Sequence, residues 1–291
     1  CRGLCGDDEA QPVRMPKPEE AQLRFTAIEK QMPAPFAVYA DFEAMNVPVA
    51  EQKDKKGDLK NTQALTEHVG CSAGYLITER RDGEVRVYAR ANYVGEDPAG
   101  WLIAELQGHL EKIRQKIQDG ARPPRLTARE EDEFQAADCC HICRGALNAD
   151  SVRDHDHLTG KFRGAAHNAC NLQWRLDPKR YKLPVFFHNL RGYDSHLLVK
   201  AFARQEEWAG RISIIPQNFE KYMALSLGGL AFKDSCQFMA DSLDRLAKNL
   251  KGETPITSGE LKRLNLSDEA CALLGQKGVF PYKWLDVEHD A

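Results

Sequence analysis

Cysteine and histidine pairs stand on either side of a polar stretch in the middle of the chain. Cys140 and Cys143 form a C-x2-C pair, and His167 and Cys170 repeat the same spacing further along. A tight turn with this spacing points two ligands the same way, and Zn²⁺ takes four such ligands in a tetrahedron. The sequence therefore predicts a structural zinc site of the Cys3His type. The neighbouring Cys139 could replace Cys140 only with a wider x3 spacing.

An Asp-His-Asp-His run between the two pairs has the residue types of a hydrolytic site. Asp154 and the next residue, His155, combine a hard oxygen ligand suited to Mg²⁺ with a general base that titrates near neutral pH. Asn171 directly follows Cys170, so a zinc knuckle would hold its carbonyl oxygen for the same ion. The competing interpretation is a zinc clip that only holds a loop.

A second set of acidic residues lies outside this cluster. Asp41 and Glu43 belong to the apolar run PFAVYADFEA, which predicts a buried strand with both acids at its end. Asp194 follows the next apolar run, LPVFFHN, at a predicted strand-to-helix turn. Three carboxylates that meet at such a crevice could hold the two metal ions, about 3.5–4 Å apart, of phosphodiester hydrolysis.

The order of predicted strands and helices indicates an α/β fold that an insert interrupts. GYLITERRDGEVRVYAR alternates around Asp82-Gly83 and predicts a hairpin, while leucine and isoleucine recur at helical spacing over 99–118. Further strands are predicted at ISIIPQ, KYMALSL and LAFKDSCQFM, and further helices at DSHLLVKAFAR, capped by Asp194, at SLDRLAKNL and at SDEACALLG. The predicted organisation is an extended lead-in over 1–34, a first domain half over 35–118, the zinc insert over 119–182 and a truncated second half over 183–291.

Composition is typical of a globular protein. The chain has 291 residues, of which 42% are hydrophobic, and this suffices for a core. No apolar run reaches the roughly 18 residues of a membrane span, and no signal-peptide pattern opens the chain, so we expect no membrane partner and no secretion. The chain begins at Cys1 and ends at Ala291, and we expect it to be a piece of a longer protein.

Cysteine usage indicates an intracellular protein, and the local charge of one segment would allow it to bind nucleic acid. Nine cysteines are an odd count, and their crowding near the predicted zinc site suits metal binding in a reducing compartment, either cytosol or nucleus. The whole chain has a net charge of −3, but residues 139–182 hold eight basic residues against four acids. This local balance fits either an ordinary solvated basic surface, which charge alone favours, or a contact with nucleic acid in this segment.

The segment CHIC…VRDHDHLTGKFRG…C-N resembles the recombination endonuclease VII family, over residues 139–171. The resemblance implies a ββα-metal, HNH-like nuclease that a zinc ion pins together. It implies that Asp154 and Asn171 hold Mg²⁺ or Mn²⁺, that His155 activates water, and that His157 lies near the scissile phosphate. His167 departs from the family, which usually has a cysteine there, and it is still a zinc ligand type.

The flanking segments PFAVYADFEA, VFFHNLRGYDSHLL and KDSCQFMADSLDRLAKNL resemble the 3′–5′ exonuclease domain of family B DNA polymerases. They are most similar to the protein-primed branch found in viruses, linear plasmids and self-synthesising mobile elements, where some members carry an endonuclease VII-like insert. The resemblance covers most of 30–291 and implies an RNase H-like mixed sheet with flanking helices. It also implies Asp41, Glu43 and Asp194 as Mg²⁺ ligands and Asn189 as a contact to single-stranded DNA.

A complete exonuclease site in that family needs a third motif, Tyr-x3-Asp. Tyr282 and Asp286 have the spacing, but the family places its motif further downstream on a helix. We expect the true motif to lie beyond Ala291, in the remainder of a polymerase-like polypeptide in cis. An active proofreading exonuclease is the alternative, and it requires Tyr282 and Asp286 to be the real motif.

The first hypothesis is a metal-dependent deoxyribonuclease, which is a hydrolase. Its cutting unit is the insert, which lies within an incomplete exonuclease domain, and its substrate is duplex DNA, branched DNA or a single-stranded 3′ end. Its main rival is a zinc-dependent DNA-binding module that grips phosphates without cutting, and the residues for this role are Arg153, Lys161, Arg163 and Arg175. Binding alone would need only such basic residues. The presence of Asp154, His155 and Asn171 together therefore favours cutting.

Overall fold

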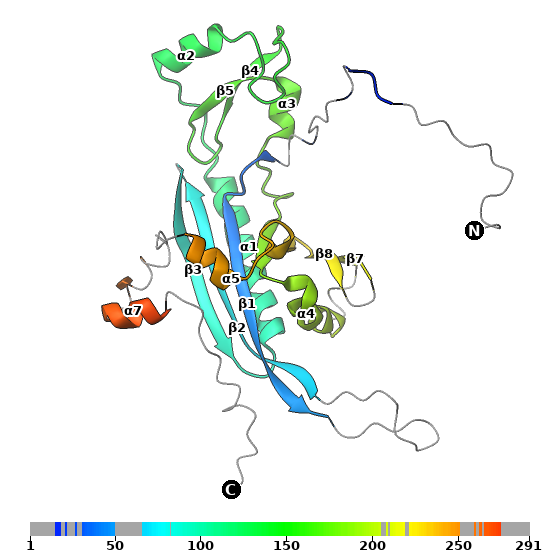
Figure 1. Ribbon diagram of the computed structural model, residues 1–291. Helices are drawn as coiled ribbons and strands as arrows, with labels where there is room; N and C mark the ends of the chain where they lie inside the picture. The colour runs from blue at the N-terminus through cyan, green and yellow to red at the C-terminus, as the bar shows by residue number, and fades with distance from the viewer. Residues whose placement is uncertain are drawn as a thin grey trace, which may run out of the picture.

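The computed structural model describes residues 15–18, 21, 27, 31–49, 66–81, 83–204, 208, 210–218, 221–250, 259, 262–263 and 265–274. Figure 1 shows a large sheet with helices packed against it, and a smaller lobe of strands and helices at one end. This lobe is the segment 119–182, which we call the insert, and the rest is the host domain. Most of the predicted lead-in lies outside the described residues, as do Tyr282 and Asp286.

The host domain is built on a mixed sheet of seven strands in the order β3-β2-β1-β6-β9-β8-β7. The strands are β1 (Phe36–Pro48), β2 (Thr66–Arg81), β3 (Glu84–Val94), β6 (Leu183–Phe187), β7 (Ile212–Pro216), β8 (Tyr222–Leu227) and β9 (Leu230–Asp234). Strands β1, β2 and β3 form an antiparallel meander, β6 and β9 continue parallel to β1, and β8 and β7 add antiparallel strands. The predicted α/β class is confirmed as a mixed α/β fold, whereas the RNase H-like assignment stays a prediction.

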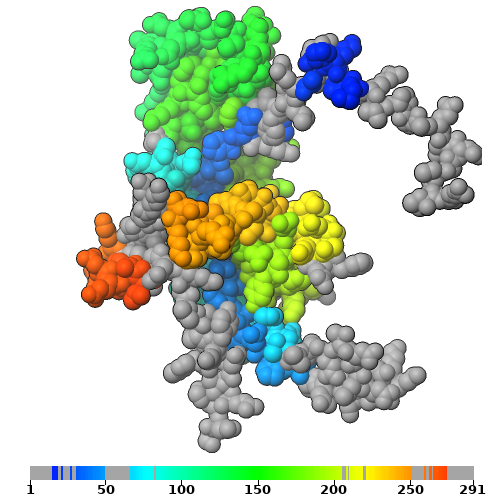
Figure 2. Space-filling view, in the orientation of Figure 1, coloured from blue at the N-terminus to red at the C-terminus, as the bar shows by residue number. Residues whose placement is uncertain are grey.

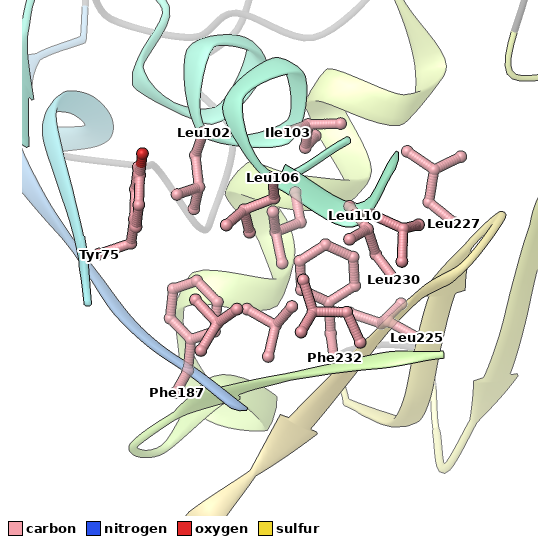
Figure 3. Packing of buried hydrophobic residues seen from close by; sticks show 14 of the residues in the cluster. Tyr75, Leu102, Ile103, Leu106, Leu110, Phe187, Leu225, Leu227, Leu230 and Phe232 are labelled. Carbon is pink, nitrogen blue, oxygen red and sulfur yellow. The ribbon is translucent and has the colours of Figure 1, made fainter. Parts of the chain in front are cut away.

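The main core lies between the sheet and helix α1 (Pro98–Asp119). The apolar stripe predicted for this helix is buried along its length, with Leu102 and Leu106 fully inaccessible to solvent. Figure 3 shows these side chains pointing toward Phe187 of β6 and Phe232 of β9. Asp97 caps the helix by accepting a hydrogen bond from the backbone N–H of Gly100, so the helix begins where its first free donors are satisfied.

The predicted hairpin is confirmed, because β2 and β3 pair in antiparallel register up to Arg81 and Glu84. Only two residues join the strands, and Gly83 has a φ of +84°. This is the backbone region that a two-residue hairpin turn requires and that glycine adopts without strain.

The position of Asp41 and Glu43 on their strand differs from the prediction. Strand β1 continues to Pro48, so both acids lie in its middle and not at its end. The reason is that β2 pairs with β1 along its whole length, whereas the parallel neighbour β6 pairs only with Val38 and Tyr39. The acids therefore follow the point at which β1 loses its partner on one side.

Helices α4 (Asp194–Ala203), α5 (Leu243–Asn249) and α7 (Asp268–Leu274) lie within the segments predicted to be helical. The prediction that Asp194 caps α4 is wrong. A short 3-10 turn, η3 (Leu190–Gly192), leads into the helix, so Tyr193 takes the N-cap position and Asp194 falls in the first turn. This turn directs the Asp194 carboxyl inward, where it is buried.

The insert contains the hairpin β4 (Ser151–His155) and β5 (Phe162–His167) followed by helix α3 (Asn168–Gln173), which packs on both strands. An additional helix, α2 (Ala128–Gln135), precedes them and was not predicted. Its signal was readable, because Thr127 and Glu130 form a capping box at its start. In the part of the chain that the structure describes, no helix is long and apolar enough to cross a membrane.

Candidate functional site

The predicted zinc ligands converge in the insert. Ligand atoms of Cys140, Cys143, His167 and Cys170 all lie within 4.8 Å of one another. The first two come from the turn before β4, His167 ends β5 and Cys170 lies on α3, so three separate pieces of chain meet at this point. Three thiols and an imidazole are the donor set that Zn²⁺ prefers, and the cluster fits a structural zinc ion.

The surroundings of the cluster prepare these side chains for a metal. His167 Nε2 lies 2.8 Å from the Ala146 carbonyl oxygen, to which it donates as an N–H. This leaves Nδ1, which lies 3.4 Å from Cys143 Sγ, as the free nitrogen on the cluster side. Burial disfavours the Cys140 thiolate, but backbone N–H groups of Cys143, His167 and Ile142 outweigh this and lower the pKa of Cys140.

The insert has a very small hydrophobic core. Its buried members are Cys140, Ile142 and Ala166, and two of its other contacts, Cys170 and Trp174, come from α3 and its C-cap. Two of these residues are zinc ligands. Since so little apolar surface is buried, ligation by a metal would contribute most of the energy that holds the insert together.

Asp154, the first acid of the Asp-His-Asp-His run, is completely buried on β4. Arg163 donates to both of its carboxylate oxygens, at 3.0 and 2.8 Å, and His141 Nε2 lies 2.8 Å from one of them. Burial raises the pKa of Asp154, but the bonds from His141 and Arg163 outweigh it and hold the pKa below its usual value. Asp154 therefore stays ionised, and any cation it binds shares it with these two residues.

Two residues that the sequence analysis missed keep this arrangement in place. The ring of Trp174, at the C-cap of α3, stacks on His141 with centroids 5.7 Å apart, and the Arg163 guanidinium lies 5.7 Å from the same ring. Gly164, at φ +151°, pairs with Asp154 across the hairpin, and a Cβ there would lie 2.7 Å from the His141 ring. Only glycine lets His141 approach Asp154 so closely.

The two histidines of the run stack on each other, with ring centroids 4.8 Å apart. His155 lies 3.2 Å from the Arg122 carbonyl oxygen through Nε2. The pKa of His157 is lowered by burial first, and then by the positive charges of His155, Arg163 and Arg175. A neutral imidazole at this position can accept a proton at neutral pH. Asn171 is half-buried on α3, three residues before Trp174 and so on the same side of that helix.

The predicted DNA-binding residues divide into two groups. Arg153 forms an ion pair with Glu131 of α2 and lies over the Phe134 ring at 4.0 Å, and Arg163 holds Asp154, so both have partners inside the insert. Lys161 and Arg175 are exposed and line separate hollows beside His157. The DNA-binding role of all four stays a prediction.

The three predicted carboxylates of the host domain lie near enough for their charges to interact, but among the described residues only the Cys3His set groups closely enough to hold a metal ion. Burial raises the pKa of Asp194 to about 7, and the negative charges of Asp41, Asp234 and Glu43 add to this increase. The pKa of Asp41 is raised because protein atoms desolvate its carboxylate, although the side chain reaches the surface. Burial and the charge of Asp41 raise the pKa of Glu43 in the same way. Crowded carboxylates of this kind lower their repulsion by binding protons or cations.

A fourth carboxylate, Asp234 at the end of β9, organises the turn that carries Asp194. It accepts hydrogen bonds from the backbone N–H groups of Asn189 at 3.0 Å and Arg191 at 3.2 Å, and it pairs with the Arg191 guanidinium. Asn189 has a φ of +70°, a conformation that this network holds. Asn189, the predicted contact to single-stranded DNA, thus begins the turn. The sequence signal for Asp234 was an acid at the end of a predicted strand, which the structure shows to be parallel to β6.

Residues 116–183 match the family model of recombination endonuclease VII. The match includes the whole Cys3His cluster, the β4–β5 hairpin and α3, so the chain carries an endonuclease VII-like domain, and this family is one of nucleases. No curated protein and no solved structure matches the chain. The comparisons therefore give no support to the family B polymerase exonuclease domain expected from the flanking motifs, or to a mobile-element origin.

The cluster predicts a sharp difference between two adjacent cysteines. We expect Cys140→Ser to lose zinc and to unfold the insert, because it removes one of four ligands. Cys139→Ser is the matched control and should keep one zinc per chain, because Cys139 is not part of the cluster. Metal content by mass spectrometry, together with limited proteolysis of the insert, tests this. Equal zinc content in both variants would contradict the assigned ligand set.

The raised pKa of Asp194 predicts that its contribution to stability falls with increasing pH. The folded-state pKa of about 7 lies above the unfolded value of about 3.9, so the native state holds the proton more tightly. Stability from this group is complete below about pH 4 and is lost as pH rises through about 7. Asp194→Asn keeps the shape without the charge and should be more stable than the wild type at pH 8, and similar to it at pH 4.

Urea denaturation at the two pH values, in buffer without divalent cations, measures this difference. The control is Asp150→Asn, which changes an exposed acid in the insert. A variant at Asp194 that is destabilised equally at both pH values would show that the carboxyl is not under electrostatic stress.

Proposed function

We propose that the insert is a zinc-stabilised, Mg²⁺-dependent DNA endonuclease. The observation that supports this most is that the endonuclease VII-like match contains Asp154, His155 and Asn171 on the same strand–strand–helix unit that the Cys3His cluster joins. A zinc clip without catalysis would need only the four ligands. The ion pair of Asp154 with Arg163 would stabilise a clip as well, but His155 and Asn171 have no role in one.

In this proposal each residue has a distinct task. His155 accepts a proton from the attacking water, and Asp154 and Asn171 supply oxygen ligands for Mg²⁺, which would stabilise charge on the scissile phosphate. Arg163 and His141 keep Asp154 ionised and oriented. His157, stacked on His155, remains neutral and faces the phosphate.

DNA is the proposed substrate, and the exposed basic residues of the insert support this choice. The runner-up function, a module that binds DNA without cutting, would use the same basic residues. The weakness of this alternative is that Arg153 and Arg163 form ion pairs inside the insert, so fewer basic side chains are left to bind DNA phosphates. The proposed setting is a reducing compartment, either cytosol or nucleus.

A second candidate function is 3′–5′ exonuclease activity in the host domain. The observation that favours it is the electrostatic coupling of three carboxylates: the charges of Asp41 and Glu43 raise the pKa of Asp194, and the charge of Asp41 raises the pKa of Glu43. An antiparallel meander followed by parallel strands, with helices against the sheet, supports the RNase H-like fold of the proposal. We place this domain in a longer polymerase-like polypeptide, where a further motif would complete the site.

The endonuclease proposal predicts a large effect at His155. His155→Ala should lower Mg²⁺-dependent cleavage of supercoiled plasmid and of a four-way junction by roughly 10²-fold or more, because a general base contributes at least this much. His196→Ala, which changes a histidine of the host domain, is the matched control and should cut like the wild type. Zinc content must be equal in all three preparations.

Three outcomes separate the candidate functions. Loss of cleavage only in His155→Ala supports the endonuclease. If wild type and variant both hold zinc and bind DNA but neither cuts, the insert is a binding module. Unchanged cleavage in His155→Ala would exclude this residue as the base.

The exonuclease candidate predicts that Asp41→Asn abolishes Mg²⁺-dependent trimming of a labelled single-stranded 3′ end while plasmid cleavage continues. The insert and host sites would then be shown to act separately. Asp286→Asn serves as the second variant: if it trims like the wild type, the Tyr282–Asp286 pair is not the third motif. A wild-type chain that trims no 3′ end would show that this chain lacks a working exonuclease site.

A further inference from the structure

A hollow of about 520 Å³ lies where the insert meets the host domain. One wall consists of Arg80, Arg81 and Gly83, at the tip of the β2–β3 hairpin, and the other includes His157, Lys161 and Arg163 of the insert. Figure 2 shows the green insert lobe directly above the cyan tip of this hairpin and the blue beginning of β1. Residues far apart in the sequence thus face each other across one space.

The charges around this hollow are predominantly positive. Arg80 and Arg81 are exposed, and neither forms an ion pair with another residue in the described ranges. The lining contains one acid among the described residues, Asp156, and its Oδ1 accepts the backbone N–H groups of Leu158 and Thr159. Its charge is therefore directed into its own turn. A water-filled space with this balance attracts a polyanion.

A second, larger hollow of about 1340 Å³ adjoins the first. His157 and Leu176 line both, and so do Met32, Pro33 and Pro35. The second hollow adds four more basic residues, Arg175, Lys179, Arg180 and Lys182. His157, which stacks on the candidate base His155, therefore lies at the junction of two basic hollows, and a backbone passing it would meet positive charge on both sides.

Several contacts hold the two walls in fixed positions. Arg80 N–H donates to the Pro35 carbonyl oxygen at 2.7 Å, which fixes the hairpin against the start of β1. On the insert side, Leu158 and Leu176 pack against the main core of the host domain. Arg122 N–H also donates to the His157 carbonyl oxygen at 2.8 Å. The hairpin tip and the histidine pair therefore belong to one connected framework.

We propose that the tip of the β2–β3 hairpin supplies part of the DNA-binding surface of the endonuclease VII-like insert. Arg80 and Arg81 contact phosphates of the strand whose scissile bond faces His155 and His157. This inference rests on the proposed function, since it names host-domain residues that position the substrate for the same site. It also explains what the host domain gives to the insert: a second, rigid basic wall that the small insert lacks.

The test uses the full chain with Arg80→Ala and Arg81→Ala combined. Its matched control is Arg86→Ala with Arg90→Ala, two exposed arginines on β3 of the same hairpin that do not line the hollow. Fluorescence anisotropy with a duplex and a four-way junction, at several salt concentrations, gives the affinity and its salt dependence. Cleavage kinetics give KM and kcat, and the melting temperature and zinc content confirm that each variant is folded.

We expect the Arg80/Arg81 variant to bind DNA roughly tenfold more weakly, with a salt slope reduced by about 1–2, because each lost phosphate contact removes about 0.9. Its KM should rise while kcat stays within about twofold of the wild type, since these residues position DNA and take no part in proton transfer. The Arg86/Arg90 control should bind and cut like the wild type.

Each other outcome is decisive. If the wild type cuts DNA but the Arg80/Arg81 variant binds and cuts as well as it does, this inference is overturned and the proposed function stands. If the control variant loses as much affinity as the test variant, net charge and not the hollow explains the effect, and the inference is again overturned. A wild-type chain that neither binds nor cuts DNA overturns both.

Discussion

The architecture of the insert depends on the convergence of four ligand atoms. The turn before β4, the end of β5 and helix α3 have few apolar contacts to hold them together, yet Cys140, Cys143, His167 and Cys170 bring them within 4.8 Å. Because His167 is the last residue of β5 and Cys170 lies on α3, the cluster sets the angle between the hairpin and the helix. That angle places Trp174 over His141 and Arg163, and these two residues hold Asp154.

The host domain solves a similar problem with backbone hydrogen bonds instead of a metal. Asp234 accepts N–H groups from the turn after β6, and this turn delivers Asp194 to the vicinity of Asp41 and Glu43. A buried carboxylate is costly unless its oxygens are satisfied, and Asp234 is satisfied by three backbone donors and one guanidinium. Among the described residues Asp194 has no comparable partners, and burial together with the charges of Asp41, Asp234 and Glu43 raises its pKa. Structural and reactive carboxylates are thus distinguished by their hydrogen-bond partners.

The two parts of the chain are joined so that each affects the surface of the other. The insert leaves the host domain after α1 and returns at β6, so both connections lie at the same end of the sheet (Figure 1). The hairpin tip of β2 and β3 ends nearby, and the hollows on either side of His157 are lined by both parts. An isolated insert would lack one of these walls. The placement of the insert between the two halves of the host domain therefore has a physical consequence for how a polyanion can approach it.

The sequence by itself determined the features that depend on short-range spacing. The two x2 pairs of the Cys3His set, the hairpin at Gly83 and the apolar stripe of α1 each follow from residues a few positions apart, where turn geometry and helical periodicity act directly. Only the tertiary structure decided which charges meet across the chain. No local spacing predicts the contacts of Asp154 with Arg163 and His141, the ion pair of Arg153 with Glu131, or the hydrogen bond from Asn189 to Asp234. Buried charges need partners, and which partner arrives depends on how distant strands and helices pack, so two arginines predicted to bind DNA instead hold the insert together.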